Sequence, residues 1–127
     1  MANGVQVELE FDIVRATLVA LNKRASMLET AIFNSLIKER TFAGCGYWTE
    51  FLESPFLKLD TPATDRYWQG PGYTIDKTTR IDCVVSLHGS CITQIEAYTY
   101  DVAWPEIIGE FKILTSEDLY RAALREN

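Results

Sequence analysis

Residues 81–100 read IDCVVSLHGSCITQIEAYTY, and this stretch carries the strongest structural signal in the chain. In its first half every second side chain is apolar, the set being Ile81, Cys83, Val85 and Leu87. A period of two is typical of a β-strand that buries one face. The turn residues His88-Gly89-Ser90 follow, so the stretch predicts a β-hairpin from Ile81 to Tyr100.

The length of the hairpin loop decides which side chains share a face. A two-residue loop would mix apolar and polar side chains, whereas a three-residue loop gathers the apolar ones on one face. We therefore expect the pairs Leu87 with Cys91, Val85 with Thr93 and Cys83 with Ile95. The same register places Asp82 directly opposite Glu96 on the polar face.

The chain before this hairpin predicts two helices and a second hairpin. From Glu8 to Asn22 apolar side chains recur every three or four residues, which is the period of an amphipathic helix. Ser26 and Glu29 form a capping box for a short second helix. Aromatic-rich segments from Phe33 to Thr41 and from Cys45 to Leu52 then predict two paired strands.

The remaining segments complete an α+β fold. Prolines and glycines from Ser54 to Gly72 predict a long loop with at most a short strand. The segment from Glu110 to Leu114 alternates like a strand, and Glu117 to Arg125 predicts a short C-terminal helix. We expect a single domain over residues 1–127, in which two N-terminal helices pack on a mainly antiparallel sheet of about four to six strands.

The overall charge and the cysteines limit the classes of function. The 127 residues carry a formal net charge of −6, which repels a phosphate backbone and disfavours direct nucleic-acid binding. The first residues lack the basic and apolar regions of a signal peptide, and no apolar run approaches the ~20 residues that span a bilayer. We expect a cytoplasmic protein with no membrane segment, and we expect Cys45, Cys83 and Cys91 to be reduced thiols.

The sequence offers few candidates for a catalytic or metal-binding site. The single histidine, His88, falls in the predicted turn near Cys91, and a turn residue beside an inert thiol is a simpler interpretation than a thiol-imidazole pair. Neither metal-ligand spacing nor a phosphate-binding loop is present, so we expect no metal and no cofactor. Asp82 and Glu96 could divide acid and base roles, or lie on a solvated sheet face neutralised by nearby cations.

Tyrosine and tryptophan side chains accompany the carboxylates on the predicted strands. Such rings anchor protein interfaces because they combine apolar area with a hydrogen-bonding tip. Since alternate residues of a strand point to opposite faces, about half of these rings should lie on the outer face of the sheet. We predict a protein-binding surface that consists of Trp48, Glu50, Asp82, Glu96, Tyr98, Tyr100, Asp101 and Trp104.

Two short strand motifs add a resemblance. They read GCGYWTEF at residues 44–51 and EAYTY at residues 96–100, and Trp104-Pro105-Glu106 follows. In these motifs the chain resembles a broad group of small, uncharacterised bacterial α+β proteins. In size, acidity and architecture it is similar to immunity proteins, which protect bacteria from toxins. The resemblance implies a protein-binding inhibitor, not an enzyme, whose acidic surface occludes a basic toxin domain.

Two other functions remain open. A phage-type inhibitor that mimics nucleic acid would use the same negative charge, although lysines and arginines interrupt the carboxylates throughout the chain. A small enzyme or ligand-binding domain would use Glu50, Asp82 or Glu96 as a general base in a pocket. The aromatic surface could also pair two copies of the chain, so a monomer and a homodimer are both compatible with the sequence.

Overall fold

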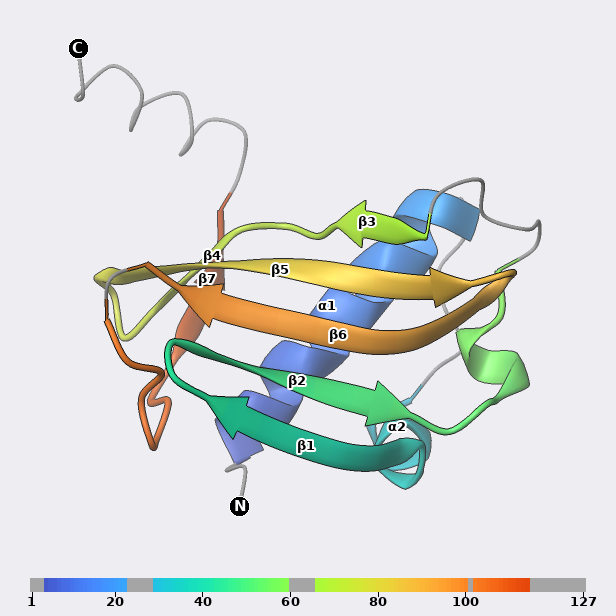
Figure 1. Cartoon of the computed structure of the whole chain (residues 1–127), viewed down its shortest axis with the longest axis horizontal. Coiled ribbons are helices and arrows are strands. Elements are labelled where there is room, and N and C mark those ends of the chain that lie inside the picture. The colour runs from blue at the N-terminus through green and yellow to red at the C-terminus, as the bar shows by residue number, and fades with distance from the viewer. Residues whose placement is uncertain (1–3, 23–28, 60–65, 101, 115–127) are drawn as a thin grey trace, which may run out of the picture.

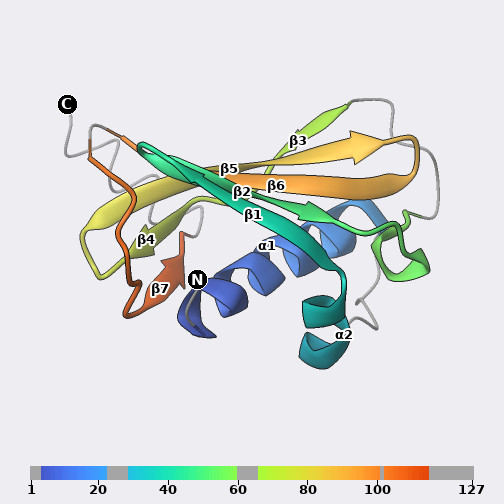
Figure 2. The same ribbon diagram turned by 60° about the horizontal axis from the view of Figure 1, so that its bottom comes forward.

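The computed structural model describes residues 4–22, 29–59, 66–100 and 102–114. The elements follow in the order α1 (Gly4–Asn22), α2 (Thr30–Ser35), β1 (Ile37–Ala43), β2 (Gly46–Phe51), the 3-10 turn η1 (Pro55–Leu57), β3 (Tyr67–Gln69), β4 (Tyr73–Ile75), β5 (Thr79–His88), β6 (Cys91–Thr99) and β7 (Phe111–Ile113). Figure 1 looks onto the sheet with α1 behind it, and Figure 2 shows α1 and α2 on that same side. The described chain is therefore α+β, with helices on one face of a sheet.

The strands form one seven-stranded sheet in the order β1-β2-β6-β5-β4-β7, and β3 also pairs with β5. All of these pairings are antiparallel. The two-residue turns Gly44-Cys45 and Gly89-Ser90 close the hairpins β1–β2 and β5–β6. Each turn begins with a glycine at positive φ, 58° at Gly44 and 62° at Gly89, where a residue without a Cβ adopts the left-handed conformation freely.

The buried face of α1 mixes apolar and polar side chains. Its apolar members join the core beneath the sheet and comprise Leu9, Ile13, Val14 and Leu18. Gln6, Glu10 and Thr17 are buried as well. Residues 6, 10, 13 and 17 follow at spacings of four and three, so they form one stripe along the helix. Polar groups thus run down the middle of the helix–sheet interface.

The β5–β6 hairpin is present, but the predicted three-residue loop is wrong. His88 pairs with Cys91 across a two-residue turn, and the register shifts by one residue next to Ser86. Thr93 is the extra residue of this β-bulge, and its hydroxyl donates to the Ser86 carbonyl oxygen at 3.3 Å. The bulge keeps the apolar side chains on one face despite the short turn, with the pairs Leu87–Ile92, Val85–Ile95 and Cys83–Ala97.

The N-terminal region departs from the prediction of two helices packed on the sheet. The helix predicted from Glu8 begins at Gly4 and is the one long helix of the described residues. The second helical segment has only six residues, Thr30–Ser35, and the Glu29 side chain makes no capping hydrogen bond. Ser26 lies outside the described residues. No described helix is long and apolar enough to span a membrane.

The first hairpin is confirmed, although its first strand begins later than predicted. Phe33 belongs to α2, and β1 begins at Ile37. The reason is burial, because the Phe33 ring is fully buried in the core. Its centroid lies 5.5 Å from that of Phe11 and 5.6 Å from that of Phe51. A helical turn at this point places the ring between α1 and β2.

The second half of the chain contains one strand more than the sequence predicts. The predicted loop from Ser54 to Gly72 holds η1 and the short strand β3. The additional strand β4 pairs with both β5 and β7, and β7 lies within the strand predicted from Glu110 to Leu114. The C-terminal helix predicted from Glu117 to Arg125 lies outside the described residues.

Candidate functional site

The sheet face opposite α1 carries aromatic and acidic side chains in three adjacent rows. Directly paired residues of antiparallel strands point to the same face, so the pairing registers define the rows. Across the strands the rows are Glu39, Glu50, Gln94, Ser86 and Tyr67; then Thr41, Trp48, Glu96, Val84 and Gln69; then Ala43, Gly46, Tyr98 and Asp82. These three rows are named the outer face. Both described helices lie on the other side of the sheet (Figure 2).

A contact network occupies one end of the outer face. Asp82 pairs with Tyr98 and not with Glu96, so the predicted pair of opposed carboxylates is wrong. The Tyr100 hydroxyl donates to Asp82, and Arg80 lies 3.4 Å from the same carboxylate. The hydrogen bond to Asp82 raises the pKa of Tyr100. The Tyr98 and Tyr100 rings meet edge to face at 5.7 Å, so this network holds both rings in defined orientations.

Three glutamates give the rest of the outer face its negative charge. Glu39 and Glu50 are direct cross-strand partners, and Glu96 lies one row away, opposite Trp48. Within the described ranges, ion pairs join only Arg40 to Glu10 and Arg80 to Asp82, so these three carboxylates have no ion-pair partner there. Like charges opposite each other are unfavourable. A cation brought by a partner would relieve this repulsion.

Most of the predicted binding residues gather on this face. Those on it or directly beside it are Trp48, Glu50, Asp82, Glu96, Tyr98 and Tyr100. Asp101 lies outside the described residues. Trp104 requires a correction because its backbone N–H donates to the Gly44 carbonyl oxygen at 3.1 Å. This bond draws the chain beneath the β1–β2 turn, where the Trp104 ring is buried against Tyr47 with centroids 4.8 Å apart.

The sequence did not reveal two other members of the outer face. Tyr67 is 65% exposed at the end of the first row, but it lies within the segment from Ser54 to Gly72, whose prolines and glycines predict a loop. Glu39 reaches the face through its pairing with Glu50. The irregular register between Ile37 and Glu39 breaks the alternation that would have indicated its side.

A buried ion pair, also missed from the sequence, fixes α1 to the first hairpin. Glu10 is fully buried, and the Arg40 side chain is 21% exposed. Arg40 donates hydrogen bonds to both carboxylate oxygens of Glu10, with Nη2 2.6 Å from Oε1 and Nε 3.0 Å from Oε2. The Thr49 hydroxyl donates to the same carboxylate. The hydrogen bond to Glu10 raises the pKa of Arg40. Thr49 lies between Trp48 and Glu50, so this pair positions the strand that carries them.

The one sequence signal for this ion pair is the position of Glu10 along the helix. Glu10 looks like one of several helix glutamates, but it shares the stripe of Gln6, Ile13 and Thr17. A carboxylate in a buried stripe requires a cation or several hydrogen-bond donors. The identity of that cation, Arg40, follows only from the pairing of β1 with β2.

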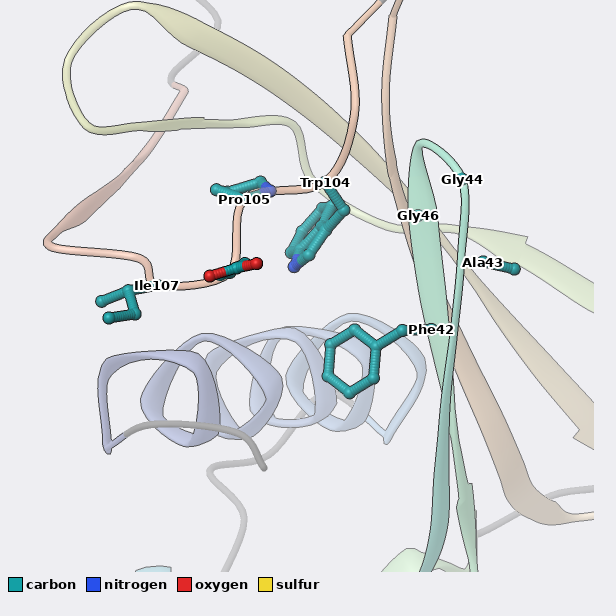
Figure 3. A pocket seen from close by; sticks show the side chains of 8 residues that line it. Phe42, Ala43, Gly44, Gly46, Trp104, Pro105 and Ile107 are labelled. Carbon is teal, nitrogen blue, oxygen red and sulfur yellow. The ribbon is translucent and has the colours of Figure 1, made fainter.

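The outer-face carboxylates lie apart from the pockets formed by described residues. One pocket of about 610 Å³ lies at the β5–β6 turn and is lined by Glu53, Ser54, Pro55, Lys58, His88, Gly89, Ser90 and Cys91. His88 and Cys91 are the last pair of that hairpin. A second pocket, of about 510 Å³, lies beside Trp104 on the α1 side (Figure 3). Glu50, Asp82 and Glu96 therefore line neither of these two pockets.

Neither the search for metal ligands nor the comparison with known proteins indicates a function. The described residues contain no group of three or more His, Cys, Asp or Glu side chains that could hold a metal ion. No protein-family model, curated protein sequence or solved structure matches the chain. The outer face is therefore the candidate functional site on its own geometry.

Proposed function

We propose that this protein binds another protein through the outer face, as an immunity-type inhibitor that occludes a basic toxin domain. The observation that carries the proposal is that rings and carboxylates occur together in every row of this face. Each row holds at least one of each, as Tyr67 with Glu39 and Glu50, Trp48 with Glu96, and Tyr98 with Asp82.

Rings and carboxylates have separate roles in this proposal. Trp48 lies in the middle row, where a large ring is enclosed most completely and contributes most to affinity. Glu96 lies directly opposite it and Glu39 and Glu50 lie in the neighbouring row, so these carboxylates attract a basic surface, which speeds association. Strands about 4.8 Å apart and up to ten residues long give a face of several hundred Å², on the scale of a standard interface.

The same geometry supports a foreign protein over the other candidate partners. Two copies meeting through their outer faces would oppose the glutamates of one copy with those of the other, and this repulsion disfavours a homodimer. A nucleic-acid mimic needs regularly spaced negative charges, whereas here Trp48 and Tyr98 separate the carboxylates and Arg80 partly neutralises Asp82.

The test is affinity capture from the native host with four matched variants. We expect the wild-type protein to retain one stoichiometric partner, and we expect Trp48→Ala and Glu96→Lys each to weaken binding by about tenfold or more. Phe56→Ala removes an exposed ring elsewhere, and Glu8→Lys makes the same charge change on α1. Both controls should bind like wild type, and titration calorimetry with the purified partner gives the dissociation constants.

The immunity function requires one more result. The captured partner, expressed alone, should be toxic to cells, and co-expression of this protein but not of Trp48→Ala should restore growth. A stoichiometric partner that binds all four variants equally would contradict the outer-face site. A non-toxic partner that is lost only with the two outer-face variants would retain the binding surface and overturn the immunity assignment.

A further inference from the structure

The pocket beside Trp104 lies on the side of the sheet opposite the outer face. Two chain segments far apart in sequence form it, and its lining consists of Phe42, Ala43, Gly44, Gly46, Trp104, Pro105, Glu106 and Ile107. Figure 3 shows Phe42 and Ile107 on either side of the space and α1 alongside it. Phe42 is 47% exposed and Ile107 is 71% exposed. Large apolar side chains therefore border the pocket without being covered by described residues.

Trp104 adds a polar group to this apolar site. Trp104 is only 8% exposed. Its ring packs on Tyr47, and the Tyr47 ring also stacks on Phe42 with centroids 5.3 Å apart. The indole Nε1 is buried and has no hydrogen-bond partner among the described residues. In Figure 3 this nitrogen lies at the ring edge that turns toward the space between Phe42 and Ile107. Buried N–H groups are almost always hydrogen-bonded.

We propose that this pocket binds a small ring compound that bears a ketone or amide oxygen and accepts a hydrogen bond from Trp104 Nε1. The ring lies against Phe42 and Ile107, and the oxygen satisfies the buried donor. Pockets with apolar walls and one well-placed polar group bind ligands of this kind. Glu106 and Ile107 are exposed, so their side chains can move aside for the oxygen without disturbing the core.

The charge of the pocket limits the ligand further. Glu106 is the single charged side chain in the lining, and the whole chain carries a formal charge of −6. Both disfavour an anion. The ligand is therefore neutral or cationic. The site is independent of the outer face, so its occupation requires no protein partner.

The test follows the indole N–H signals of the ¹⁵N-labelled protein during titration with three probes. Acetophenone carries a ring and an acceptor, ethylbenzene has nearly the same shape without the acceptor, and benzoate is an anion. We expect acetophenone to shift the Trp104 signal downfield in a saturable way. It should bind about two- to tenfold more tightly than ethylbenzene, the range that one hydrogen bond supplies, and benzoate should bind more weakly than either.

Two variants identify the site. Trp104→Phe assigns the signal by removing it and should abolish the preference for acetophenone, as judged from shifts of the Gly44 and Gly46 amides. Trp48→Phe changes a tryptophan on the outer face and should leave the titration unchanged. A folded Trp104→Phe protein that keeps the preference would overturn the proposal. Equal affinities for acetophenone and ethylbenzene in the wild-type protein, or no saturable shift with any probe, would overturn it as well.

Discussion

At the scale of single residues, the buried Glu10–Arg40 pair links the core to the candidate site. The pair joins α1 to β1, and the Thr49 hydroxyl connects it to β2. Charges moved out of water are unfavourable unless they are fully paired. Here the two oxygens of the Glu10 carboxylate accept hydrogen bonds from Arg40 and Thr49. The buried charge is therefore stabilised only while both partners are present. Removing one member leaves the other buried and unpaired.

We therefore predict a large difference between two arginine substitutions. Arg40→Met leaves the Glu10 carboxylate without its cation and should lower the free energy of unfolding by about 3–5 kcal/mol. Arg80→Met removes the partner of Asp82, but the Arg80 side chain is 45% exposed, so this change should cost about 0–1 kcal/mol. Urea denaturation of both variants measures the difference. Equal losses would contradict the structural role assigned to the buried pair.

At the scale of elements, the pairing of β2 with β6 depends on a glycine. A Cβ placed on Gly46 would lie 2.5 Å from the Ala97 carbonyl oxygen and 3.1 Å from the Tyr98 Cβ. The closest of these atoms is backbone of the neighbouring strand, so it cannot move aside alone. Gly44 differs because it has a positive φ of 58° and a Cβ added there would meet nothing within 4 Å. Gly46 is required because there is no space for a Cβ, and Gly44 is required because of its backbone conformation.

We predict that Gly46→Ala destabilises the protein by about 1–3 kcal/mol, the range for overpacking. Gly44→Asn should cost less than about 1 kcal/mol, because asparagine tolerates the left-handed region. Hydrogen exchange separates the two effects. Amides of β2 and β6 should exchange faster in Gly46→Ala and keep their wild-type rates in Gly44→Asn. Unchanged exchange between β2 and β6 in Gly46→Ala would show that the strands accommodate the extra carbon.

The hairpins also show how much of the fold could be predicted from the sequence. Alternation in residues 81–87 was sufficient to predict β5, but the bulge at Thr93 depends on a contact with Ser86 that no local pattern reveals. Next to the turn the register error was one residue, since Leu87 pairs with Ile92 rather than Cys91, and beyond the bulge it was two, since Asp82 pairs with Tyr98 rather than Glu96. A shift of two leaves every side chain on its original face. For this reason Asp82, Glu96 and Tyr98, the predicted surface residues of this hairpin beyond the bulge, were grouped correctly although their pairs were not.

At the scale of the whole molecule, three acidic groups with raised pKa values are enclosed between the sheet and α1. Burial raises the pKa of Cys83 to about 12. Burial also raises the pKa of Tyr47. The pKa of Tyr73 is raised by burial and by its hydrogen bond to Asp12, at 2.6 Å. All three groups therefore remain protonated in the folded protein well above the pH at which they ionise in the unfolded chain.

This difference predicts a loss of stability in alkaline solution. The unfolded chain releases the Cys83 proton near its usual pKa of 9.0 and the two tyrosine protons near 10.0, while the folded protein retains them. The folded state then binds more protons, so the free energy of unfolding falls as pH rises. Each group adds a slope of up to about 1.4 kcal/mol per pH unit. The decline should begin near pH 9 and steepen above pH 10.

Denaturant unfolding at intervals from pH 8 to pH 11 measures this decline, and two variants divide it. Cys83→Ala removes the thiol and should flatten the curve between pH 9 and pH 10. Tyr73→Phe should leave that part unchanged and reduce the slope above pH 10 by about 1.4 kcal/mol per pH unit. Tyr67→Phe is the control, because Tyr67 is 65% exposed and lies on the other side of the sheet. If Tyr73→Phe and Tyr67→Phe reduced the alkaline slope equally, burial under α1 would not be the cause.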